Sequence, residues 1–531
     1  MYIHENPETP LLLNCFLNCI VSDALTFCRN LKRPGSLLIS LVFLIACNPS
    51  GPKNERELYA QHCGSCHAVP DPANLPKNIW QEQILPDMGA RLGMDTGFDP
   101  LEGWSFNEQA EILKSGAYLS KSSLTPEAWE TIKAYVLREA PDSMPSRPSK
   151  DLPQLSGFEE VPIQLDSSYV SNITYLEFHP DPGLVEIGTM AGQSMTLGPG
   201  RSVQKRPLRI PSGVVDSEPY HGATLLTAIG KFTPTELDMG QLVLVDDTST
   251  APLGPPLHRP VHTDITDLDG DGREEFLVCE YGNLQGALSL LYQDEGGTWQ
   301  KKSLLQLPGA IRTKILDLDG DGDLDIAAVF GQAREGVYFF YQEPELNFRM
   351  EQVISYSPLY GTSWFELADL DGDGDLDIVT AQGDNADKSY VAKPFHGIRI
   401  HLNDGGNAFT EDYFYEMNGA SRVCVADMDQ DGDQDLVVLS AFPDYLEANW
   451  QHLIYLECIN QEKLEYQARK VDAARNGRWL VMEVADYDGD SDADIILGGF
   501  RFSLGPVPDE LTETWEQEGQ ADLLILENQL H

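Results

Sequence analysis

Basic residues are scarce in this sequence. Only 36 lysines and arginines stand against 84 aspartates and glutamates in 531 residues, and the formal net charge is −48. Because proteins bind phosphate backbones through Lys and Arg, this balance excludes a nucleic-acid partner. It also disfavours binding to anionic lipid through a basic face. The hydrophobic fraction of 42% is enough for a sizeable core, so the acidity does not make the chain disordered.

Long apolar runs are also lacking. No run reaches the roughly 20 residues that a helix needs to span a bilayer. The short run 36–46 follows Arg29, Lys32 and Arg33, and this order is typical of a secretory signal. The run ends in LIAC at positions 44–47, which resembles the lipobox of bacterial lipoproteins. The resemblance implies export, lipidation of Cys47 and anchoring to a bacterial membrane, on the periplasmic side or at the cell surface.

We therefore interpret residues 1–47 as a signal and lipobox region. Residues 1–30 are unusual for a lipoprotein signal, and they indicate either a start codon assigned too far upstream or a long signal.

Cysteines are few as well, with nine in the chain. Three precede Cys47, two form the motif described next, and three are widely spaced, which excludes a dense disulfide framework.

The motif CGSCH at 63–67 predicts covalently attached c-type haem. Cys63 and Cys66 would form thioethers to the haem vinyl groups, and His67 would be the proximal ligand of the iron. A zinc site would need a second pair of ligands nearby, and a thioredoxin-like redox motif lacks the histidine. Covalent haem attachment takes place outside the cytoplasm, which agrees with export.

The flanks of this motif predict a small helical domain at 53–141. A helix is compatible with residues 55–62, Ser105 begins a capping box, and Thr125 precedes a third helix. The whole resembles a class I cytochrome c, which implies a methionine as the sixth iron ligand. Met88, expected in a turn after a helix that begins near residue 78, is the first candidate, and Met94 is the alternative. The Pro-rich segment 142–155 is expected to be a linker.

Five acidic loops then recur at intervals of 50 to 59 residues. Each carries acids at alternate positions, with glycine at position 6 in the first four loops. Hard oxygen ligands at this spacing, with a glycine that permits a sharp turn, suit Ca²⁺. The expected ligands are Asp267, Asp269, Asp271 and Glu275; Asp317, Asp319, Asp321, Asp323 and Asp325; Asp369, Asp371, Asp373, Asp375 and Asp377; Asp427, Asp429, Asp431, Asp433 and Asp435; and Asp486, Asp488, Asp490, Asp492 and Asp494.

The first and last loops depart from the pattern. Arg273 takes position 7 of the first loop, and Ser491 takes the glycine position of the last, where we expect a looser turn. No glutamate stands at position 12, and an apolar run such as 326–330 or 436–439 follows each loop. The loops therefore precede strands and are not EF-hands.

Several short strands in each unit of 50–60 residues predict the blades of a β-propeller. The loops resemble those of the FG-GAP/VCBS repeat family, whose architecture integrin α-chain propellers share. Segments 175–186 and 225–245 fit two degenerate blades, which gives seven blades over 156–531, and a terminal strand at 522–526 is expected to pair with the first blade. The predicted fold is a small all-α cytochrome c domain followed by an all-β propeller with seven blades.

These features predict an exported monohaem electron carrier that is not an enzyme, with a calcium-binding propeller that binds a partner. The expected partners are a redox protein of the cell envelope and a protein or carbohydrate ligand of the propeller. Two alternatives stay open. One is a quinone-dependent sugar or alcohol dehydrogenase with the haem as electron acceptor, and the other is a calcium-dependent adhesion module.

Overall fold

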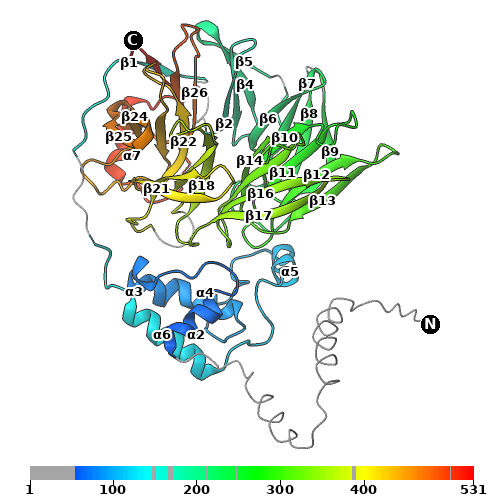
Figure 1. Ribbon diagram of the computed structural model, residues 1–531, viewed down its shortest axis with the longest axis vertical. Helices are drawn as coiled ribbons and strands as arrows, with labels where there is room; N and C mark the ends of the chain where they lie inside the picture. Colours follow the sequence, from blue (N-terminus) through cyan, green and yellow to red (C-terminus); the bar gives the residue numbers. More distant parts are fainter. Residues whose placement is uncertain are drawn as a thin grey trace, which may run out of the picture. The chain divides into compact units, whose positions relative to one another are not determined.

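A computed structural model describes residues 54–145, 151–165, 172–206, 208–210, 212–246, 248–385, 390–502 and 504–530. The predicted signal and lipobox region, including Cys47, lies outside them. From residue 158 onward the strands form seven antiparallel sheets of four strands each, which makes a seven-bladed β-propeller (Figure 1).

Each of the first six blades is a meander of four consecutive strands. Blades 1 to 3 consist of β2 (Ile173–His179), β3 (Leu184–Thr189), β4 (Ser194–Gly198) and β5 (Ser202–Lys205); β6 (Val214–Tyr220), β7 (Ala223–Ala228), β8 (Gly240–Val245) and β9 (Thr250–Leu257); and β10 (Pro260–Thr266), β11 (Glu275–Glu280), β12 (Ala287–Gln293) and β13 (Trp299–Leu305). Blades 4 to 6 consist of β14 (Ala310–Leu316), β15 (Asp325–Phe330), β16 (Gly336–Glu343) and β17 (Asn347–Ser355); β18 (Thr362–Ala368), β19 (Asp377–Gln382), β20 (Gly397–Asn403) and β21 (Phe409–Glu416); and β22 (Ala420–Ala426), β23 (Asp435–Ser440), β24 (Leu453–Asn460) and β25 (Glu465–Lys470). The two degenerate blades expected before the acidic loops are confirmed.

The seventh blade combines the two ends of the propeller. It contains β26 (Trp479–Ala485), β27 (Asp494–Gly499) and β28 (Leu523–Asn528), and its outer strand is β1 (Phe158–Ile163), which pairs antiparallel with β28. The expectation that the terminal strand closes the ring is confirmed, but its partner β1 belongs to the last blade and not to the first. Pairing with β1 covers the edge that β28 would otherwise leave unpaired.

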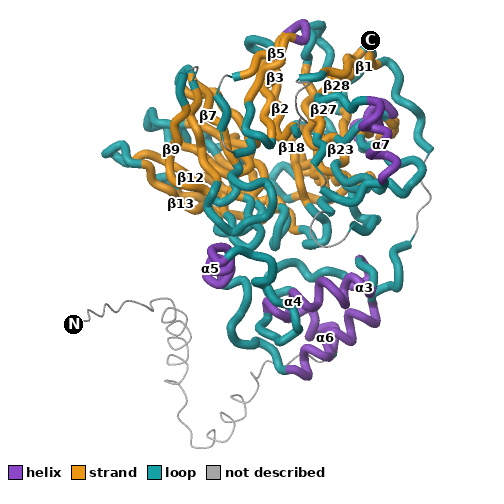
Figure 2. Tube along the Cα trace, turned by 180° about the vertical axis from the view of Figure 1, so that it is seen from behind, coloured by secondary structure: helices purple, strands orange, loops and turns teal. Residues whose placement is uncertain are grey.

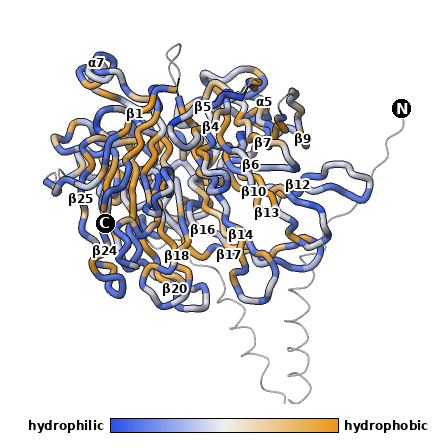
Figure 3. The backbone as a smooth tube through the Cα atoms, turned by 90° about the horizontal axis from the view of Figure 1, so that it is seen from above, coloured by the Kyte–Doolittle hydropathy of each residue, from blue (hydrophilic) through white to orange (hydrophobic). Residues whose placement is uncertain are grey.

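The core lies between neighbouring blades. The second strands β11, β15, β19, β23 and β27 are buried at every residue, since a sheet covers each of their faces. Val437 and Leu439 of blade 6, for example, pack in one cluster with Ile495 and Leu497 of blade 7. In Figure 3 the strand segments are mostly hydrophobic and many connecting loops are hydrophilic. Burial of both faces explains why the strands that follow the acidic loops are continuous apolar runs in the sequence.

Residues 54–141 are helical (Figure 2). The elements are α2 (Glu55–Cys63), η2 (Pro72–Asn74), α3 (Lys77–Ile79), the π-helical η3 (Trp80–Ile84), α4 (Leu85–Arg91), α5 (Phe106–Ser115) and α6 (Pro126–Glu139). The predicted caps are confirmed: Ser105 and Glu108 form a capping box on α5, and the Thr125 side chain accepts a hydrogen bond from Ala128 N–H at the start of α6.

The small core of this helical part includes Tyr59, Trp80, Trp129, Ile132 and Val136. Beyond it, the propeller region carries short helical turns at η4 (Pro199–Arg201), η5 (Gln461–Lys463) and η6 (Asp472–Asn476), and a helix α7 (Asp509–Glu518) that the sequence did not predict. Within the described part of the chain, none of the helices has the length and apolar character needed to cross a membrane.

Candidate functional site: acidic loops and the CGSCH motif

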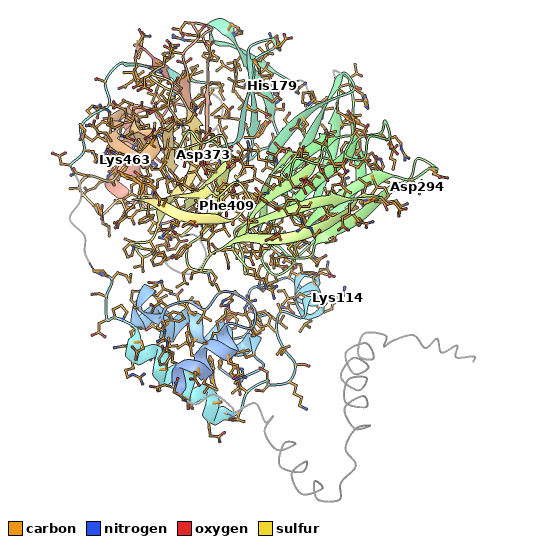
Figure 4. All side chains as sticks on the ribbon, in the orientation of Figure 1. Lys114, His179, Asp294, Asp373, Phe409 and Lys463 are labelled. Carbon is orange, nitrogen blue, oxygen red and sulfur yellow. The ribbon has the colours of Figure 1, made fainter. Side chains whose placement is uncertain are left out.

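Each acidic loop joins the first and second strands of a blade, so the five loops occupy equivalent places in blades 3 to 7. In the second loop, Asp317 accepts hydrogen bonds from the N–H groups of Gly320 (2.8 Å) and Gly322 (3.1 Å). Both glycines have positive φ, +77° and +95°, which side chains disfavour. These bonds curl the backbone of the loop around the carboxylate of the first aspartate. The later carboxylates of the loop then point to the same side. Figure 4 labels Asp373 of the third loop.

The acid at position 9 has a structural role that the sequence did not indicate. It begins the second strand and is buried in every loop. Asp377 accepts hydrogen bonds from the N–H of Leu370, at position 2 of its loop, and from the N–H of Asn403 in β20, both at 2.9 Å. The same pair of bonds recurs at Asp325, Asp435 and Asp494. This carboxylate therefore fastens the loop to the third strand of the blade.

Carboxylate oxygens converge in all five loops. In each loop three acids place oxygens within 4.8 Å of one another. The groups are Asp267, Asp269 and Asp271; Asp317, Asp319 and Asp325; Asp369, Asp371 and Asp377; Asp427, Asp429 and Asp435; and Asp486, Asp488 and Asp490. The predicted ligands at position 7 lie outside these groups, as do those at position 5 in the middle three loops and the position-9 acids Glu275 and Asp494 of the first and last loops. Aspartate clusters of this kind can hold a metal ion.

The pKa values of the loop carboxyl groups show the effect of this crowding and of burial. Burial, with added repulsion from the neighbouring aspartates, raises the pKa of Asp377 to about 6 and that of Glu275 to about 7. The pKa of Asp435 and of Asp494 is raised to about 6, again chiefly by burial. Asp427 Oδ1 is buried and accepts no hydrogen bond from the described residues. A cation would relieve the repulsion and give this oxygen a partner.

The two atypical loops keep the same winding. Ser491 adopts φ +80°, and its N–H donates to Asp486 at 3.1 Å, as the glycines of the other loops do. The expectation of a looser turn in the last loop is therefore wrong. In the first loop, the Arg273 guanidinium is hydrogen-bonded to Asp271, which lowers the pKa of that carboxyl. Arg273 thus already neutralises one carboxylate of that loop.

The CGSCH motif, for which the sequence predicts haem attachment, begins at the end of α2. Cys63 is the last residue of the helix and is partly buried, Cys66 is exposed, and both are free thiols. Burial raises the pKa of the Cys63 thiol to about 12. His67 Nδ1 lies 2.8 Å from the carbonyl oxygen of Ala68. With the proton on Nδ1, this bond fixes the ring and leaves Nε2 free to bind a metal. The donor set therefore fits the axial and thioether requirements of haem c.

The two candidate sixth ligands lie in different surroundings. Met88 lies inside α4, so the expectation that it occupies a turn is wrong, and the π-helical and α-helical turns from residue 80 to 91 are continuous. Arg91, one turn further on, is close enough to lower the pKa of His67, which burial already depresses. Met94 follows the helix end, and its Sδ lies 3.0 Å from Ser122 Oγ.

The helical part contains a cavity of about 740 Å³. Its wall includes Met94, Leu85, Leu124, Trp129 and Leu137. Charged side chains, among them Asp95, Glu130 and Lys133, also line the cavity, and its size is in the range that proteins use for cofactors. Neither His67 nor Met88 is part of its lining. No sequence signal pointed to this cavity, because its wall comes from α4, α6 and the loops between residues 93 and 124.

Comparison with protein families identifies the repeats. Residues 267–328 and 317–380 each match the FG-GAP-like repeat. The two matches run from one acidic loop into the second strand of the following blade, over blades 3 to 5. The chain thus contains FG-GAP-like repeats within a seven-bladed β-propeller. No curated protein matches the sequence.

Three solved structures show a partial likeness to this chain. BBS1N, from a crystal structure in complex with ARL6DN, is 10% identical, with a TM-score of 0.40 over 71% of this chain and 98% of that chain. Sqt1 of Saccharomyces cerevisiae is 11% identical, with a TM-score of 0.39 over 66% and 83%. The Pan2 WD40 domain of Neurospora crassa is 12% identical, with a TM-score of 0.40 over 71% and 98%. The number of blades rests on the seven sheets alone.

Proposed function

We propose that this protein is an exported, lipid-anchored cytochrome c whose calcium-binding propeller binds a partner. The FG-GAP-like propeller is a module for binding a ligand or partner, and the helical part would add electron transfer. The observation that carries the redox role is the arrangement at the end of α2: two free thiols and a histidine whose Nδ1 is held by a backbone carbonyl. Bound haem would supply an iron that cycles between Fe(III) and Fe(II).

In this proposal Cys63 and Cys66 hold the haem by thioethers, and His67 Nε2 binds the iron. The sixth ligand is Met88 or Met94. Met94 is favoured because it lines the cavity of the helical part. Met88 is favoured because it lies one turn before Arg91 in α4, and Arg91 is close enough to His67 to lower the pKa of that histidine. The buried tryptophans Trp80 and Trp129 would keep water from one side of the site.

Visible spectra of the full chain, produced in a host that attaches c-type haem, test this role. We expect covalent haem in the wild type and in Met88→Leu and Met94→Leu, and loss of attachment in Cys63→Ala/Cys66→Ala. Loss of the weak red methionine–iron band in only one of the methionine variants identifies the sixth ligand. A wild type without covalent haem refutes the cytochrome proposal and leaves a binding propeller.

Calcium is proposed for the acidic loops because three acids converge in each, and because burial, with added repulsion between the acids, raises the pKa of carboxyl groups there. Because the position-9 acids fasten the loops to the third strands, the proposed role of calcium is to rigidify the blades. Calorimetric titration of the metal-free protein measures how many ions bind and how tightly. Absence of calcium binding at millimolar concentration would refute this part.

Anchoring is proposed from the lipobox-like sequence before Cys47. Metabolic labelling with a radioactive fatty acid in a bacterial host tests it directly. We expect label in the wild type and none in Cys47→Ser, with both proteins exported. Equal labelling of the two proteins would refute Cys47 as the site. The expected basic redox partner of the cell envelope follows from the acidity of the chain, which would attract it.

A further inference from the structure

The acidic loops of neighbouring blades are linked by side-chain amides. In each link, an amide N–H group at or just after the end of the third strand of one blade donates to a backbone carbonyl oxygen in the acidic loop of the preceding blade. The four links are Gln342 to Leu268 (3.0 Å), Asn407 to Leu318 (2.8 Å), Gln461 to Asp369 (3.4 Å) and Asn528 to Met428 (2.7 Å). They connect blades 3 to 7 in an unbroken series.

Gln342 and Asn528 each connect two loops directly. The Gln342 N–H donates to the position-9 acid Asp325 of the second loop (2.7 Å), while its side chain bonds to the first loop. The Asn528 N–H likewise donates to Asp494 of the fifth loop (2.8 Å), while its side chain bonds to the fourth loop. A displacement of the position-9 acid in one loop is therefore passed to the loop of the preceding blade.

The link between the second and third loops passes through a turn. Asp377 of the third loop accepts the N–H of Asn403 (2.9 Å). The Asn403 side-chain oxygen accepts the N–H of Asn407 (2.9 Å), and the Asn407 amide donates to Leu318 of the second loop. Three successive hydrogen bonds thus join the position-9 acid of one loop to the backbone of the other.

The link between the third and fourth loops is built in a similar way. The position-9 acid Asp435 accepts the N–H of Cys458 (2.7 Å), and Gln461 follows three residues later at the start of η5. In Figure 4, Asp373 marks the third loop and Lys463 marks η5. All four links therefore begin at or near the residue that a position-9 acid holds.

The fourth and fifth loops also contact each other directly. The Gln430 side chain of the fourth loop donates to the carbonyl oxygen of Ser491 in the fifth loop (2.9 Å). Asp494 does not belong to the converging acids of the fifth loop. This second contact therefore connects the fourth loop to the part of the fifth loop that lies beside its converging acids.

The carbonyl group that accepts each amide lies between the converging acids or next to them. In three links it belongs to position 2 of the loop, between the aspartates at positions 1 and 3, and in the fourth it belongs to Asp369 at position 1. The N–H of the position-2 residue donates to the loop's own position-9 acid, as Leu318 does to Asp325 (2.9 Å). The amide of the next blade thus fixes the segment that carries two of the three converging acids.

The amide links occur where two neighbouring blades both carry an acidic loop. In blade 2, which lacks such a loop, His221 and Gly222 join the first two strands. Gln293 occupies the place of Gln342 in blade 3, and its side chain makes no such bond to the described residues of blade 2. Between blades 7 and 1, the Tyr487 hydroxyl of the fifth loop donates to a backbone carbonyl instead. This distribution indicates that the amides serve the acidic loops and not blade packing in general.

We propose that these amides position the acidic loop of the preceding blade for calcium, so that the five loops bind calcium cooperatively along blades 3 to 7. The inference rests on the proposed calcium binding. Asp325, Asp377 and Asp435 belong to the converging groups, so each would be held in place when its loop is occupied. The end of the third strand and the amide would then be held as well, and the neighbouring loop would need less ordering to bind its own ion. By linkage, the effect is equal in both directions.

Hydrogen exchange measured by mass spectrometry, in a calcium titration of the full chain, tests this proposal because each loop gives its own peptides and its own midpoint. Asp317→Asn/Asp319→Asn disables the second loop. We expect the calcium midpoints of the first and third loops to rise about threefold or more, since each loses the order that its link supplies. Asp412→Asn removes an exposed carboxylate of β21 and should leave all midpoints unchanged.

Two negative results have different meanings in this experiment. Unchanged midpoints in the first and third loops would overturn the cooperative link and leave calcium binding intact. Absence of calcium-dependent protection in all five loops would refute the proposed calcium binding, and this inference with it.

A variant of the link itself separates coupling from stability. Gln342→Met removes the amide and keeps the N–H that bonds to Asp325. We expect the first-loop midpoint to rise about threefold, and disabling the second loop in this variant to cause no further rise. Gln467→Met, at an exposed glutamine of β25, is the matched control and should behave as the wild type.

Circular dichroism and the melting temperature in chelator show whether each variant is folded. A merely structural role of Gln342 would lower the melting temperature and leave the coupling between the two loops in place. A folded Gln342→Met whose first loop still responds to loss of the second as in the wild type therefore contradicts the assignment.

Discussion

The carboxylate of Asp377 and the backbone N–H of Asn403, 26 residues apart, are hydrogen-bonded at 2.9 Å. The second oxygen of Asp377 accepts the N–H of Leu370. Asparagine cannot accept both bonds in the same geometry, because its amide nitrogen is a donor and would face an N–H group. We expect Asp377→Asn to lower the free energy of unfolding by about 1–3 kcal/mol even without calcium.

Urea unfolding in a chelator measures this loss. The matched control is Asp373→Asn in the same loop, since Asp373 is exposed and accepts one bond through an oxygen that asparagine retains. The two variants should therefore differ in stability without calcium. Equal stability would show that the position-9 acid does not fasten the loop.

Removal of calcium should lower the melting temperature of the propeller. Each loop that binds calcium at a free concentration 100 times its Kd adds about 2.7 kcal/mol to the folded state. Chelation removes this contribution and leaves the repulsion among the carboxylates. Differential scanning calorimetry with and without chelator measures the shift, and Asp317→Asn/Asp319→Asn should bind one ion fewer than Asp412→Asn. An unchanged melting temperature on chelation contradicts the prediction.

Glu335 should make stability fall as pH rises. Its side chain is 2% exposed and bonds to the N–H and hydroxyl of Thr362, both at 2.9 Å, and burial raises its pKa to about 8 from the ordinary 4.5. Between these two values the folded state holds a proton that the unfolded state has lost. Stability therefore decreases from about pH 4.5 to pH 8 through this group.

Glu335→Gln removes that dependence and keeps an oxygen to accept both bonds. The variant should gain in melting temperature relative to the wild type as the pH is raised from 5 to 8. Glu351→Gln, at an exposed glutamate of β17, is the control and should follow the wild type. A constant difference between Glu335→Gln and the wild type across this range would argue against the raised pKa.

Closure of the ring by β1 should carry measurable stability. Ile163 is 7% exposed, packs in the core between blades 7 and 1, and pairs with Leu523. Ile163→Ala should cost about 2 kcal/mol, at the low end for a buried isoleucine because β1 is an outer strand. Glu160→Ala, on the exposed face of the same strand, is the control. Equal denaturation midpoints in urea would show that β1 contributes little.

Much of the propeller could be predicted from the sequence, because the acidic loops recur at one place in each blade. The loops mark the boundary between first and second strands, and the apolar runs after them mark the buried strands. The partner of β28 could not be predicted in this way, since β1 lies outside the repeat and pairing between distant strands leaves no local signal. Helix α7 is an insertion in the last blade that the periodicity does not cover.

The positions of the acidic loops also contain a signal for charged side chains in the first strands of the blades. Asp264, Lys314, Glu366 and Glu483 each stand three residues before the first aspartate of a loop. Charges at a fixed step inside otherwise apolar strands indicate a surface that several blades share.

The burial of the position-9 acids was not predictable. An acid in this loop pattern is expected to be a metal ligand, and the second N–H group that bonds to it lies in the third strand, far along the chain. The place of Met88 in a helix was missed because Pro86 and Gly89 suggested a turn, whereas α4 follows directly on the π-helical η3 and the helix continues through both residues.

The shared last blade has a consequence for how the chain acquires its structure. Phe158 and its partner Asn528 are separated by 370 residues, so β1 leaves the ribosome long before the strand that it pairs with exists. Six blades can form from local hairpins, but the seventh waits for both ends. Completion of the ring therefore waits until β28 has been synthesised, and a chain that lacks β28 would also lose the closure. Until closure, the edge of β1 is exposed to other chains and could pair with them.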